Sequence, residues 1–164
     1  ATRLGVWMLN VHASGGRAML GAARDAVDRA AATTGRPKPL LIGVTVLTNL
    51  GPADLIQQGT DIPPADLVRH RAMLAKEAGF DGVGASGLEA ASIREASGTG
   101  FLIVTPGIRP EGSATQGQTR IVTPAMAISA GADYLVVGRP ITAARDPREA
   151  AEAIVAEIDS ALAG

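Results

Sequence analysis

FLIVTPGIRP, residues 101–110, and YLVVGRPIT, residues 134–142, decide the fold of this chain. Each stretch is a short run of branched and aliphatic residues, typical of a buried strand, followed by a turn that holds a glycine and then an arginine. Glycine lets backbone N–H groups approach an anion closely, and the arginine guanidinium offers a planar fork of donors that matches phosphate. Two such turns at neighbouring strand ends predict a clamp for a phosphorylated small molecule, with Arg109 and Arg139 as its charged groups.

Five apolar runs are continuous rather than alternating, which is typical of parallel strands buried on both faces. They are Leu4–Val11, Leu40–Leu47, Gly82–Ala85, Phe101–Val104 and Tyr134–Val137. Helical patterns lie between and after them, at Arg17–Ala32, Pro64–Ala78, Leu88–Ala96, Pro124–Ala130 and from Asp146-Pro147 to about Leu162. This alternation predicts an α/β fold with a parallel sheet, in a single domain over residues 1–164.

The spacing of the units suits a barrel. The 164 residues divided by five give about 33 residues per unit, and a TIM (β/α)₈ barrel needs about 31 per unit and about 250 in all. Two architectures therefore stay open: a five-strand open sheet, or about five βα units of a TIM barrel. We find no internal repeat beyond the βα period.

Composition excludes several classes of protein. The formal net charge of −1 disfavours a nucleic-acid or membrane surface, and the absence of cysteine excludes disulfides and thiolate metal sites. No apolar run reaches the roughly 18 residues of a membrane span, and the first residues lack the form of a signal peptide. We expect a cytoplasmic enzyme.

The segment 107–120, rich in glycine and polar residues, has the length of a lid over a ligand.

At this point a family resemblance becomes specific. Residues 105–142, TPGIRPEGSATQGQTRIVTPAMAISAGADYLVVGRPIT, closely resemble the C-terminal part of the orotidine 5′-phosphate decarboxylase family. LGVWMLNVHASGG at 4–16 and LLIGVTVLTNL at 40–50 do so too, in the expected order. The resemblance covers essentially the whole chain. It implies a TIM barrel that converts orotidine 5′-phosphate to UMP and CO₂ without metal or organic cofactor, in homodimers with sites at the interface.

The same resemblance implies roles for particular residues. Gly138 and Arg139, after the eighth strand of the barrel, would hold the phosphate, together with Arg109 and the lid glutamine Gln118. Thr48, at the end of the fifth strand, would lie by the pyrimidine. Asn49 follows it where the family commonly has small hydroxyl residues, so the detail of the base contact departs from the pattern.

One departure from the family is large. Its chemistry rests on an Asp-x-Lys-x-x-Asp motif after the third strand, whose lysine protonates the carbanion, plus a lysine on the second strand. The chain has no such motif, and its lysines are Lys38, in a loop at the start of a strand, and Lys76, within a helix. We therefore assign no catalytic residue, and expect strands four to eight of the barrel in a fragment or truncated form, inactive alone.

Two other functions remain compatible with the sequence. Another phosphate-binding barrel enzyme, such as a sugar-phosphate decarboxylase or an epimerase, would share the two turns. A non-enzymatic half barrel would instead assemble with itself through its open parallel edges.

Overall fold

The computed structural model describes residues 1–110 and 122–163. The strands are β1 (Met8–His12), β2 (Leu40–Val44), β3 (Gly82–Gly84), β4 (Leu102–Thr105) and β5 (Tyr134–Leu135). The helices are α1 (Gly16–Thr34), α2 (Pro52–Gln57), α3 (Pro64–Glu77), α4 (Gly87–Ser97), α5 (Pro124–Ser129), α6 (Arg139–Thr142) and α7 (Pro147–Ala163). Short 3₁₀ turns, η1 (Thr2–Leu4) and η2 (Ala13–Gly15), flank β1.

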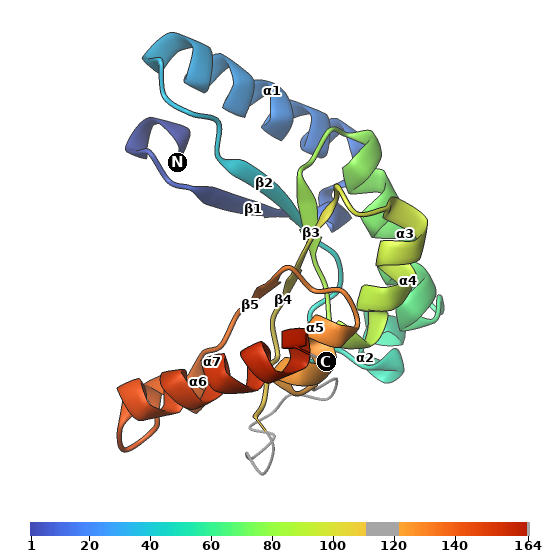
Figure 1. Cartoon of the computed structure of the whole chain (residues 1–164). Helices are drawn as coiled ribbons and strands as arrows, with labels where there is room; N and C mark the ends of the chain where they lie inside the picture. Colours follow the sequence, from blue (N-terminus) through green and yellow to red (C-terminus); the bar gives the residue numbers. More distant parts are fainter. Residues whose placement is uncertain (111–121, 164) are drawn as a thin grey trace.

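The five strands form one parallel sheet in sequential order, β1-β2-β3-β4-β5. Met8 pairs with Leu40 and Val104 with Tyr134, so each strand lies beside the next in the chain. A doubly wound sheet reverses its strand order at a switch point, and this sheet does not. The connecting helices follow one another along the outer side of the curved sheet (Figure 1). This arrangement is that of a barrel wall.

An aromatic contact shows how strongly the sheet curves. The rings of Trp7, just before β1, and Tyr134, the first residue of β5, meet edge to face with their centroids 5.3 Å apart. These residues belong to opposite edges of the sheet, which in a flat five-strand sheet would lie about 19 Å apart. The two edges therefore turn toward each other across the concave side. Of the two architectures open from the sequence, the barrel is the one formed.

The main core lies between the sheet and its outer helices. Fully buried side chains there include Leu20 of α1, Val68 of α3, Ile93 of α4 and, from the sheet, Leu41 and Ile103. The concave face differs from the prediction of strands covered on both faces, because no described helix packs on it. Its apolar side chains instead line a hollow of about 380 Å³.

The predicted element boundaries need several corrections. The first strand begins at Met8 rather than Leu4, because residues 2–4 form η1 and Gly5 ends it in the left-handed region at φ +74°. The second strand ends at Val44 rather than Leu47, and the fifth ends at Leu135 rather than Val137. The helices α2 and α6, of six and four residues, were not predicted, since they are too short to show a helical period.

A structural repeat at the amino ends of the strands was also missed. Ala-Gly-x-Asp occurs at 78–81 and at 130–133. Asp81 accepts a hydrogen bond from Leu41 N (2.7 Å), and Asp133 accepts one from Ile103 N (2.7 Å), in each case at the neighbouring strand. An arginine from an outer helix pairs with each carboxylate, Arg24 at 3.3 Å and Arg94 at 2.7 Å. This repeated clamp joins each of two strand pairs at the rim opposite the glycine-arginine turns.

Within residues 1–110 and 122–163, no helix is both long and apolar enough to cross a bilayer.

Candidate phosphate-binding site

The first glycine-arginine turn leaves β4 at Thr105 and buries its arginine. Arg109 is only 6% exposed, and its Nη1 donates to the carbonyl of Ile108 at 2.7 Å. Its backbone N–H donates to Val122 O (3.0 Å), on the far side of the segment that the structure does not describe. Its Nε is buried and has no partner among the described residues. The turn thus holds a buried guanidinium whose Nε is unpaired among the described residues.

The second turn brings another guanidinium to the same place. Arg139 is the exposed first residue of α6 and follows Gly138, just after β5. Burial lowers the pKa of Arg109, and the positive charge of Arg139 lowers it further. A neighbouring like charge disfavours a second positive charge, and an anion between them would reverse that effect. The two turns therefore lie close enough for their charges to interact, and their role as a phosphate clamp stays a prediction.

Thr48 lies against the first turn. It is 6% exposed, in the loop that follows β2. Gly107 takes φ +79°, a left-handed conformation that side chains rarely adopt. A Cβ placed on Gly107 would lie 3.1 Å from Thr48 Oγ1, so the hydroxyl packs directly on the glycine. The structure thus brings the predicted base contact and the predicted phosphate turn together.

The hollow on the concave face reaches this end of the sheet. Its lining includes Met8, Ile42 and Val44 deeper in, and Pro106 and Val136 beside the two turns. A volume of about 380 Å³ lies in the range of small-molecule sites. It can therefore receive the uncharged part of a ligand whose phosphate lies at the arginines.

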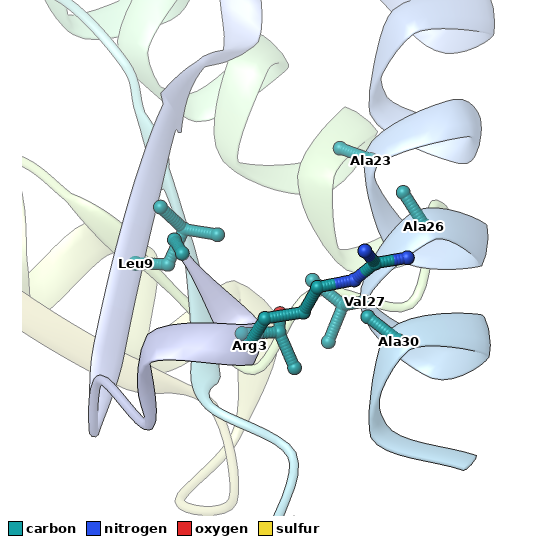
Figure 2. A pocket seen from close by; sticks show the side chains of 8 residues that line it. Arg3, Leu9, Ala23, Ala26, Val27 and Ala30 are labelled. Carbon is teal, nitrogen blue, oxygen red and sulfur yellow. The ribbon is translucent and has the colours of Figure 1, made fainter. Parts of the chain in front are cut away.

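A second hollow, of about 290 Å³, lies on the outside of the sheet between the start of β1 and α1. Figure 2 shows Leu9, Ala23, Ala26, Val27 and Ala30 around it, with the side chain of Arg3 across it. Apart from that arginine, the labelled side chains are aliphatic. Nothing there converges on a charged ligand, and the predicted site residues do not line it.

The two lysines of the chain contact groups outside the two glycine-arginine turns. Lys38 Nζ pairs with Asp28 at 3.0 Å, and Lys76 Nζ donates to the Ser97 carbonyl at 2.8 Å. Neither lysine lines the concave hollow. Gln118, and the segment 111–121 of the predicted lid, lie outside the described residues. Within the described ranges, no group of three or more His, Asp or Glu side chains could hold a metal ion.

Sequence reasoning missed one residue near the site. Arg71 of α3 donates from Nη1 to the carbonyl of Thr45 (2.8 Å), at the carboxyl end of β2. Nothing in the sequence marks it, because it follows Arg69 and His70 in what reads as a solvated helix surface. Its partner is a backbone carbonyl, and such a contact leaves no pattern of residue types.

Comparisons with known proteins identify the family of this chain. The model of the "Orotidine 5′-phosphate decarboxylase / HUMPS family" matches residues 1–154. Orotidine 5′-phosphate decarboxylase from Moorella thermoacetica is 56% identical over 158 residues, which are 96% of this chain and 63% of that protein. The enzyme of the same name from Photobacterium profundum is 48% identical, over 99% of this chain and 67% of its own length. The chain thus spans about two thirds of the length of these curated relatives.

Solved structures give the same result. A crystal structure of orotidine 5′-phosphate decarboxylase from Lactobacillus acidophilus superposes with a TM-score of 0.78 at 39% identity, over 96% of this chain and 66% of that one. The orotidine 5′-monophosphate decarboxylase of Sulfolobus solfataricus, at 21% identity and a TM-score of 0.65, shares the fold. These neighbours are TIM barrels, so the prediction of a partial barrel of strands four to eight is confirmed as to fold class. The chain belongs to the orotidine 5′-phosphate decarboxylase / HUMPS family.

Proposed function

We propose that this chain provides the phosphate- and pyrimidine-binding part of an orotidine 5′-phosphate decarboxylase, a carboxy-lyase that makes UMP and CO₂. The single observation that carries the proposal is the pairing of buried Arg109 with Arg139 at the ends of β4 and β5. Burial, and next the positive charge of Arg139, lower the pKa of Arg109. A multivalent anion bound at both guanidinium groups would compensate their charges. The family's substrate carries such an anion, the 5′-phosphate.

The proposed roles follow the geometry. Arg139 and Arg109 bind the phosphate, and Gly138 leaves the backbone beside it open, with no atom within 4 Å of a Cβ placed there. Thr48, which packs on Gly107 of the first turn, would lie by the pyrimidine. Gln118 is assigned to the phosphate by resemblance alone. Binding energy at a phosphate remote from the reacting carbon can be used to hold the base in its reactive position, which accelerates the reaction.

The proton donor of the reaction has no candidate among these 164 residues. The sequence has no Asp-x-Lys-x-x-Asp, and both lysines are engaged away from the hollow. We propose that these residues alone bind the nucleotide without turning it over. The homodimer and the cytoplasmic location that the family implies are also proposals, and sedimentation of the purified chain tests the first.

The test is an isothermal titration calorimetry measurement of UMP binding to the chain. Arg139→Ala removes a charge-assisted contact, and we expect a loss of about 2 kcal/mol, or roughly thirtyfold in Kd. Arg148→Ala is the matched control, since its guanidinium is 88% exposed and pairs only with Glu152 among the described residues. If the two variants bound UMP with equal Kd values, the proposal that Arg139 binds the phosphate would be refuted. Tighter binding of ribose 5-phosphate than of UMP would favour a sugar-phosphate enzyme.

A further inference from the structure

Arg71 is half-buried and lacks a compensating charge among the described residues. Burial lowers the pKa of its guanidinium below the ordinary value for arginine. Among the described residues, no carboxylate pairs with Arg71. Other arginines of the chain do have at least one carboxylate partner: Arg17, Arg24, Arg94 and Arg148. Desolvating an unpaired cation costs stability, so its presence in a fold needs another explanation.

The one described contact of the guanidinium fixes the start of the loop after β2. Thr45 is buried, and both its backbone N–H (3.0 Å) and its hydroxyl (2.8 Å) donate to Gly84 O. Arg71 holds the remaining polar group of that residue, its carbonyl. With all three groups of Thr45 engaged, the direction in which the chain leaves the sheet is set.

The other end of the loop is also fixed. Leu50 N donates to Leu47 O in a turn (3.0 Å), and Asp54 Oδ2 accepts from Gly51 N (2.7 Å) where α2 begins. Between the two anchors lies Thr48, which packs on Gly107 of the phosphate turn. A shift of the first anchor would therefore move Thr48 relative to the turn that carries Arg109.

We propose that Arg71 is a positioning residue, which holds the Thr45 carbonyl and thereby places Thr48 against the phosphate turn for contact with the ligand's base. The inference rests on the proposed function for the identity of that ligand. Arg71 acts through Thr45 and Thr48 and does not itself touch the substrate. Its loss should weaken recognition of the base and leave recognition of the phosphate unchanged.

The experiment compares two ligands that share a phosphate and differ in the base, UMP and ribose 5-phosphate. For Arg71→Met we expect the Kd of UMP to rise roughly tenfold, since small misplacements of a positioned group have effects of this order or larger. The Kd of ribose 5-phosphate should stay within about twofold in the same titration. Arg71→Lys, which keeps a donor for the carbonyl, should recover part of the UMP affinity. Arg69→Met is the matched control, an exposed arginine of the same helix.

A second measurement keeps the two proposals separate. Amide hydrogen exchange over residues 45–51 should speed up in Arg71→Met and not in Arg69→Met. An equal loss of affinity for both ligands, or unchanged exchange in the loop, would overturn the positioning role. If the unaltered chain bound neither ligand while Arg71→Met still loosened the loop, the proposed function would fail and the anchoring by Arg71 would stand.

Discussion

Replacement of Asp133 by alanine should destabilise the fold more than its partly exposed position suggests. Its carboxylate accepts from Ile103 N and from Arg94 Nη2, both at 2.7 Å, and the two side chains are 31% and 20% exposed. The hydrogen bond between a charged acceptor and a backbone N–H contributes about 1.5–3 kcal/mol. The ion pair, screened by its partial exposure, adds about 0.5 kcal/mol. We expect a loss of about 2–3 kcal/mol, which lowers Tm by about 5–10 °C in a domain of this size.

Thermal and urea unfolding, followed by circular dichroism, measure this loss. Asp133→Asn separates its two parts, because an amide oxygen still accepts from Ile103 N while the ion pair is lost. Glu152→Ala is the control: its carboxylate lies 2.8 Å from Arg148 Nε, but the two side chains are 65% and 88% exposed. That variant should stay within about 0.5 kcal/mol of the parent. An Asp133→Ala variant as stable as Glu152→Ala would refute the reasoning that the clamp joins β4 to β5.

Three further predictions test other parts of the structure. Thr105 is fully buried and its hydroxyl has no partner among the described residues, so Thr105→Val should raise Tm by a few degrees, the gain from removing an unsatisfied group of about 1 kcal/mol. A hydrogen bond from Lys38, and next the charge of Arg24, lower the pKa of Asp28, so Lys38→Met should raise that pKa in an NMR titration. Gly107→Ala should both lower Tm and weaken UMP binding, since φ +79° disfavours a side chain.

The fold was predictable from the sequence because each strand is a short apolar run between helical patterns. The spacing of the units left open whether the sheet curves toward a barrel, and only the family resemblance decided it, since strand order and curvature depend on long-range contacts such as Trp7 with Tyr134. The start of β1 was placed too early, because Leu4 looks like a strand residue but is 82% exposed, in η1. An apolar residue next to a strand does not show in the sequence whether it belongs to the strand or to the turn before it.

The candidate site was proposed where a phosphate site requires a residue type at a strand end. Glycine followed by arginine marked both turns, and the structure brings Arg139 close enough to lower the pKa of Arg109. The contact between Thr48 and Gly107 required the register of two loops, which no local pattern encodes. The hydrogen bond from Arg71 to a backbone carbonyl could not be predicted from the sequence either, because every residue type offers that acceptor.

The two rims of the sheet use arginine in opposite ways. At the amino ends of the strands, Arg24 and Arg94 each pair with an aspartate that also holds a neighbouring strand, so charge there contributes to stability. At the carboxyl ends, the charge of Arg139 lowers the pKa of Arg109, and neither arginine has a carboxylate partner within residues 1–110 and 122–163. A phosphate bound between them would relieve the repulsion between the two charges, so we expect ligand binding and stability to be linked at this rim. Neutral substitutions there should stabilise the free chain and weaken binding together, which is the trade-off expected where function maintains an unfavourable arrangement.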